Sequence, residues 1–301
     1  MTLVNIRGID LMKHAVEILF YFETAVFFIF SIAAIYKIVK NPALSFTLAP
    51  FYNSKDFSWN WILKGTSVAV LSYLGFDAMT TLAEESIEAR KTVKKAVLLV
   101  IPIIAFFFVS QTYLAGVLHP GYSFENPDVA FWSIASETGK WVQFLCWLGT
   151  VIAWGIGDTL AGQAAVSRIL FAMGRNRQLP SFFAKIHEKY KTPYISIIIS
   201  AIVTMALIFL LTLKDLSSLV NFGALSAFIM LNFSLIVLFF KEKKYGKSFV
   251  SLIGLIVVAA IWANIDSLAK TIGFIWLAVG FIYLLYITKG FKRSVVIPEE
   301  D

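Results

Sequence analysis

The chain has 301 residues, of which 58% are hydrophobic and only 15% are charged, and its mean hydropathy is +0.77. Soluble domains carry about 25% charged residues, so this composition excludes a protein whose whole surface faces water and indicates lipid as the main solvent. The single cysteine, Cys146, excludes an intrachain disulfide, and the cysteine and histidine spacing does not match a zinc site. We therefore expect neither a metal site nor a bound cofactor.

Eight apolar segments follow one another along the chain. A hydrocarbon core of ~30 Å needs about 20 apolar residues in a helix, and backbone groups in lipid must find their partners within their own segment. The segments cover residues 14–36, 61–83, 96–118, 141–166, 194–213, 219–240, 249–264 and 271–287, and the seventh is short. We predict an all-α integral membrane protein with about eight transmembrane helices.

The basic residues are distributed unevenly between the two sides that these segments define. Nineteen of the 26 Lys and Arg residues fall on the side that holds both termini, and seven fall on the other side. Cytoplasmic loops carry an excess of Lys and Arg, so we predict a multi-pass protein of the cell membrane with both termini in the cytoplasm. The net charge of +7 then reports topology, and we expect no nucleic-acid partner.

The second segment contains a cluster that is typical of a broken helix. Gly75 weakens a helix, and Asp77 favours a helix N-cap over an interior position. We expect one half-helix to end near Tyr73 and another to begin after Asp77, about 15 residues into the segment and past the membrane midplane. Such breaks are tolerated where protein or water surrounds them, and transporters use them to bind ionic groups. A plain span in which Asp77 is a local cap is the alternative.

Several motifs together resemble the amino acid–polyamine–organocation (APC) permeases. They are SYLGFD at 72–77 with TLAEE at 81–85, AAVSRILFAMGR at 164–175 with LP at 179–180, KTP at 191–193, VNFGAL at 220–225 and NIRG at 5–8. The resemblance implies a leucine-transporter-type fold of twelve helices, in which five helices are repeated with inverted topology. The eight segments would match helices five to twelve, so residues 1–301 would form a single, incomplete permease domain that lacks the first four helices.

The resemblance also implies which residues bind the substrate. Tyr73, Leu74 and Gly75 would offer backbone carbonyls to a substrate ammonium group, and Phe76 would close over the substrate. Phe76 could equally be a packing residue, and Asp77 could be a cap or a ligand.

Two further carboxylates lie within the predicted spans. Glu23 is ~14 Å deep, where a charged side chain costs roughly 2.5–3.5 kcal/mol, and it aligns with a lysine of some proton-coupled members of the superfamily. It could carry the coupled proton or bond to a neighbouring helix. Asp158 lies among small residues that suit close helix packing or a polar core. Together with Asp77, these groups would suit a cationic substrate, such as a polyamine or a basic amino acid, and neutral amino acids are an equally weighted alternative.

These features predict secondary active transport of amino acids, either proton-coupled or by exchange. The alternatives are import of a putrescine-like polyamine or a basic amino acid, and a truncated membrane fragment that does not transport. The sequence lacks a nucleotide-binding loop, so we do not expect a primary pump. We also do not expect an enzyme, because a membrane enzyme would need a nucleophile with a base or a metal cluster, and the three histidines and one cysteine do not form such a pattern in the sequence. The expected partners are a small-molecule substrate, the lipid bilayer and a separate chain that supplies the missing helices.

Overall fold

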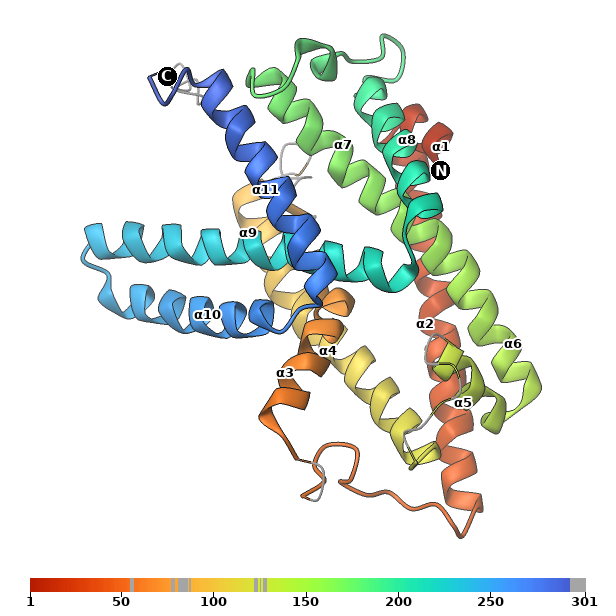
Figure 1. Cartoon of the computed structure of the whole chain (residues 1–301). Helices are drawn as coiled ribbons and strands as arrows, with labels where there is room; N and C mark the ends of the chain where they lie inside the picture. Colours follow the sequence, from red (N-terminus) through yellow and green to blue (C-terminus); the bar gives the residue numbers. More distant parts are fainter. Residues whose placement is uncertain are drawn as a thin grey trace. The chain divides into compact units, whose positions relative to one another are not determined.

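The computed structural model describes most of the chain, and the described part is helical without strands (Figure 1). The described residues are 1–54, 57–76, 79–80, 86, 88–121, 124, 126 and 129–292, and the side chains of 9–13 and 89–90 are not described. The chain divides into two compact units. The first unit comprises Met1–Phe57 and Gly75–Ile202, and the second comprises Ser58–Leu74 and Val203–Asp301.

The first unit is built around one long helix. Its elements are α1 (Thr2–Arg7), α2 (Ile9–Lys40), α4 (Ala89–Leu118), α5 (Ala130–Thr138), α6 (Lys140–Gly149), the π-helical segment η4 (Thr150–Asp158), α7 (Thr159–Arg175), the 3₁₀ turn η5 (Ser181–Ala184) and the first part of α8 (Tyr194–Leu210). Phe30 of α2 is 1% exposed and belongs to a core with Ala135 of α5 and Val142 of α6. The side of α2 that carries Phe30 therefore organises this unit.

Helices α6 and α7 are joined without a loop through η4, so that Lys140–Arg175 forms one continuous helical run. A π-helical turn inserts extra backbone into an α-helix and often marks a functional position. Gly149, at the end of α6, would place a Cβ 3.5 Å from the side chain of Val26. The small residue lets this run lie close against α2.

The second unit contains α3 (Trp59–Ala69), the 3₁₀ segment η1 (Val70–Tyr73), the end of α8, α9 (Leu213–Lys241), α10 (Tyr245–Ala263) and α11 (Ser267–Ile287). Helices α9 and α10 form a hairpin and lie side by side along most of their length (Figure 1). Thr212 begins α9 with a capping box, in which its hydroxyl accepts from the Asp215 amide and the Asp215 carboxylate accepts from the Thr212 amide.

The core of the second unit lies where α9 meets α11. Phe222 and Leu225 of α9 pack with Ile265 and Ala269, and Val70 of η1 packs against this cluster. Gly273 of α11 contacts the Phe222 ring so closely that a Cβ at this position would collide with it. The aromatic side chain thus occupies the space that a larger residue in α11 would need.

The helices have the length and surface of membrane spans. Within the described ranges, six helical segments are long and apolar enough to cross a membrane: His14–Lys40, Lys91–Leu118, Lys140–Arg175, Leu213–Lys241, Tyr245–Ala263 and Ser267–Ile287. Large apolar side chains on these segments face outward, such as Trp276 at 75% exposure and Tyr286 at 80%. Such a surface suits lipid and would be a liability in water. The protein is therefore an all-α, multi-pass membrane protein, as predicted.

All eight predicted segments are helical over most of their described residues. The fifth is α8, which has 17 residues and falls just short of a full span. The second is α3 with η1, which ends at Tyr73 and is followed by extended backbone at Leu74. The predicted end of the first half-helix near Tyr73 is confirmed.

Candidate functional site

The break in the second segment is formed by three successive changes of backbone conformation. The α-helix α3 ends at Ala69, η1 continues as a tighter 3₁₀ helix to Tyr73, and Leu74 is extended with φ −65° and ψ 148°. Gly75 follows with φ +103°, a conformation that residues with a Cβ rarely adopt. Carbonyl groups at the end of a helix lose their i+4 donors, so this stretch can offer backbone acceptors to a ligand.

The predicted site residues lie at this break. Tyr73, Leu74 and Phe76 are half-buried, and Gly75 is exposed. Asp77 lies outside the described residues, as does most of the chain in which the second half-helix is expected. The structure therefore brings Tyr73 to Phe76 together at one interruption, and their role in binding stays a prediction.

The second candidate feature is a pair of carboxylates that the packing of α2 against η4 brings together. Gly157, next to Asp158, would place a Cβ 3.6 Å from the side chain of Leu19. Glu23 lies one helical turn after Leu19 and so shares its face. Glu23 and Asp158 lie within electrostatic range of each other, although 135 positions separate them in the sequence. Within the first unit, both side chains are exposed.

A buried polar network connects α1 to α7 and α8 by hydrogen bonds. It was not predicted from the sequence. Asn5 is 6% exposed, and its Nδ2 donates to the Leu160 carbonyl at 3.1 Å and to Gln163 Oε1 at 2.9 Å. Gln163 Nε2 donates to Thr2 Oγ1 at 3.1 Å and to the Ile197 carbonyl at 3.3 Å. The available signal was the polarity of Asn5 and Gln163 next to apolar residues, but it does not reveal which groups meet.

A small pocket adjoins this network. Its free volume of about 20 Å³ is enough for roughly one water molecule. Asn5, Ser167, Arg168 and Thr192 supply polar lining, and the Thr192 hydroxyl donates to the Ile6 carbonyl at 2.7 Å. The pocket is too small for an amino acid, so we assign it a structural role.

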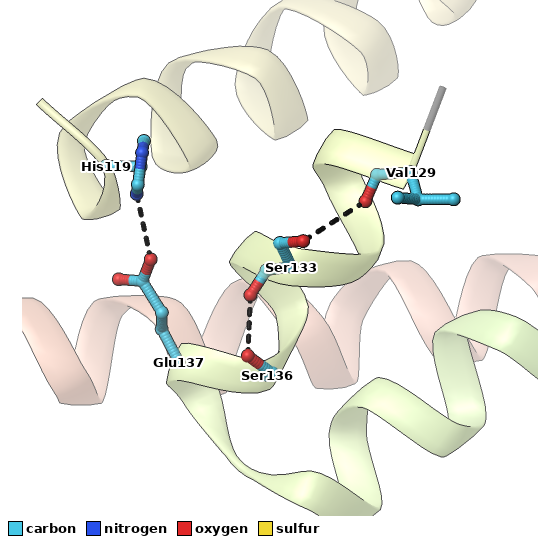
Figure 2. A network of polar contacts seen from close by, with 5 residues as sticks. All are labelled: His119, Val129, Ser133, Ser136 and Glu137. Carbon is cyan, nitrogen blue, oxygen red and sulfur yellow. Dashed lines mark hydrogen bonds and ion pairs between the residues drawn. The ribbon is translucent and has the colours of Figure 1, made fainter. Parts of the chain in front are cut away.

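A third polar cluster connects α4 to α5 (Figure 2). His119, directly after α4, lies 3.0 Å from Glu137 Oε1 through its Nδ1 atom, and its ring stacks on Phe124. The hydroxyls of Ser133 and Ser136 bond to carbonyls of their own helix. The connection between α4 and α6 thus contains the short helix α5.

Comparison with known proteins identifies the family. Residues 1–295 match the amino acid permease family. The chain belongs to this family. It is 32% identical over 246 residues to the low-affinity putrescine importer PlaP of Escherichia coli strain K12, covering 78% of this chain and 54% of PlaP. It is 27% identical to the branched-chain amino acid permease BcaP of Bacillus subtilis strain 168, covering 77% of this chain and 52% of BcaP.

A plant relative broadens the range of substrates among these permeases. The chain is 31% identical over 173 residues to the vacuolar cationic amino acid transporter 4 of Arabidopsis thaliana, covering 57% of this chain and 28% of the relative. The chain spans about half the length of the two bacterial relatives. All three relatives are named as transporters, which agrees with the prediction that the chain is not an enzyme.

Proposed function

We propose that the chain is part of a secondary transporter that moves amino acids or related amines across the cell membrane. The observation that carries this proposal is the interrupted helix. This chain belongs to the amino acid permease family. Its helical run of α3 and η1 ends at Tyr73, and Gly75 then turns the backbone with φ +103°. A substrate ammonium group is a strong donor that suits the carbonyls of Tyr73, Leu74 and Gly75. Phe76, which follows directly in the sequence, would close over the bound substrate.

A cationic substrate is the choice that the electrostatics favour. Glu23 and Asp158 are two acidic groups of the first unit within electrostatic range of each other, and Asp77 is a third acidic residue that follows Gly75 and Phe76 in the sequence. Two of the three relatives described above are named for putrescine or cationic amino acids. The branched-chain permease BcaP keeps neutral amino acids as the second candidate class.

We also assign the coupling step to the carboxylate pair. Glu23 is the group proposed to take up and release the coupled proton, with Asp158 as its electrostatic neighbour. Two carboxylates that interact favour sharing a proton, because two like charges in a poorly solvated place repel each other. Substrate exchange without proton movement is the competing mode.

The exposure of these carboxylates supports a partner within the membrane. A charged group facing lipid at membrane depth is costly, so such groups face protein or a watery cavity. We propose that helices from a separate chain cover Glu23 and Asp158 and complete the transporter. By the distribution of basic residues, both termini lie in the cytoplasm.

Uptake by the purified chain in liposomes tests the proposal. Radiolabelled putrescine, arginine and leucine are offered with and without an inward proton gradient, and protein-free liposomes and a protonophore serve as controls. We expect saturable binding, strongest for the two cations, and we expect the protonophore to reduce any uptake by the chain. Binding of all three compounds is measured in detergent on the same sample. Absence of both binding and uptake would overturn the proposal, whereas binding without uptake would support the site and show that the chain needs its partner.

A further inference from the structure

One buried side chain of α9 reaches the end of the helix that breaks. Asn221 Nδ2 donates to the backbone carbonyl of Ser67 at 2.9 Å. Asn221 is 3% exposed and Ser67 is 7% exposed. Ser67 lies in the last turn of α3, where helix carbonyls begin to lose their own i+4 donors. A side chain that is 154 positions away in the sequence thus supplies a donor where the helix itself runs short.

The surroundings hold this contact in place within the second unit. The Ser67 hydroxyl donates to the Lys64 carbonyl at 2.7 Å and lies 3.5 Å from the Asn264 carbonyl. Phe222, next to Asn221, is 3% exposed in the core against which Val70 packs. The amide of Asn221 therefore has little freedom to move away from α3.

The two polar atoms of the Asn221 side-chain amide differ, because within the described part of the chain only the donor Nδ2 is hydrogen-bonded. Asn221 Oδ1 is buried and has no hydrogen-bond partner among the described residues. An orphaned buried acceptor is destabilising, and each case calls for an explanation. A leucine of similar size would remove the orphan oxygen, but it would also leave the Ser67 carbonyl without this donor.

We propose that Asn221 is a positioning residue that fixes where α3 gives way to the break. The α-helix ends two residues after Ser67, and the 3₁₀ segment, extended Leu74 and Gly75 follow directly. Holding the Ser67 carbonyl sets the register at which the tighter helix begins, and hence the direction of the carbonyls at Tyr73 and Leu74. This inference rests on the proposed function, in which those carbonyls receive the substrate.

Substitution of Asn221 with a matched control tests the inference. Asn232 lies on the same helix, and its Nδ2 donates to the Phe228 carbonyl of α9 itself at 2.9 Å. Asn221→Leu removes the donor to α3, whereas Asn232→Leu removes a donor that stays within one helix. Hydrogen exchange of the amides of 70–74 is followed by mass spectrometry on the full chain in detergent. We expect roughly five- to tenfold faster exchange there for Asn221→Leu, as for one lost hydrogen bond, and an unchanged rate for Asn232→Leu.

Substrate affinity is measured on the same samples with labelled putrescine. We expect a loss of similar size for Asn221→Leu with an unchanged unfolding temperature, which a purely structural residue would not produce. Should Asn221→Leu fail to fold, Asn221→Ala replaces it with the same expectation for exchange and affinity, and with a lower unfolding temperature because of the cavity it leaves. Equal exchange at 70–74 in the Asn221 and Asn232 variants would overturn the inference. If the unaltered chain binds no substrate, the proposed function fails while the exchange comparison still decides the role of Asn221.

Discussion

Replacing Gly75 with alanine should weaken the break without crowding it. Gly75 has φ +103°, and an added Cβ would meet no atom within 4 Å. The cost is therefore conformational, about 1–3 kcal/mol for a residue held in a sparsely populated region. Since 1.4 kcal/mol is tenfold in an equilibrium constant, the broken backbone becomes roughly 5- to 150-fold less favourable. We expect the affinity for labelled putrescine, measured by equilibrium binding in detergent, to fall by a factor in this range.

Gly65 provides the matched control because it also has open space around its Cβ position. It lies inside α3, and no atom falls within 4 Å of its added Cβ. Alanine is favoured over glycine in a helix by about 1 kcal/mol, so Gly65→Ala should keep or slightly raise the unfolding temperature and leave affinity unchanged. Equal binding by Gly75→Ala and Gly65→Ala would refute the reasoning, because the two changes differ mainly in backbone conformation.

Two further substitutions test the proton-coupling group and the packing of the second unit. Glu23→Gln removes a titrating group at constant size, so uptake should lose its dependence on pH, whereas Glu17→Gln, closer to the start of α2, should keep the normal profile. Uptake by Glu23→Gln that still follows pH would exclude Glu23 from coupling. Gly273→Ala places a Cβ against the Phe222 ring and should cost about 1–3 kcal/mol as overpacking, seen as a lower unfolding temperature. Gly280→Ala on the same helix meets no atom within 4 Å and should leave that temperature unchanged, and equal temperatures for the two variants would contradict the packing argument.

The helices were predictable because lipid restricts the backbone more than water does. A long apolar run has few alternatives to a helix, so the runs at 219–240 and 271–287 appear as α9 and α11. Their ends were less predictable. Helix α2 begins at Ile9 and α7 ends at Arg175, beyond the apolar stretches, because a helix continues into polar surroundings where hydropathy no longer reports it.

The position of the break was predictable for a local reason, and the contacts that hold it were not. Gly75 and Asp77 both disfavour a continuous helix, although they lie within an apolar run that otherwise predicts one. This conflict can be seen in the local sequence alone. The bond from Asn221 to Ser67 depends on how α9 lies against α3. An asparagine in an apolar segment has many possible partners, and only tertiary packing selects one. The same holds for Asn5 and Gln163, which are 158 positions apart.

The exposure of Glu23 in the first unit supports the proposed partner helices. Glu23 lies nine residues after His14, where the apolar span of α2 begins, so it is about 14 Å from that end of the span and farther from the end at Lys40. A glutamate side chain cannot span that distance to reach an interface. Lipid contact would cost about 2.5–3.5 kcal/mol for a charged group, and Asp158 beside it would add a second penalty. Polar cover is therefore expected at this place on α2 and η4, and the partner helices proposed above would supply it and give the two carboxylates a use.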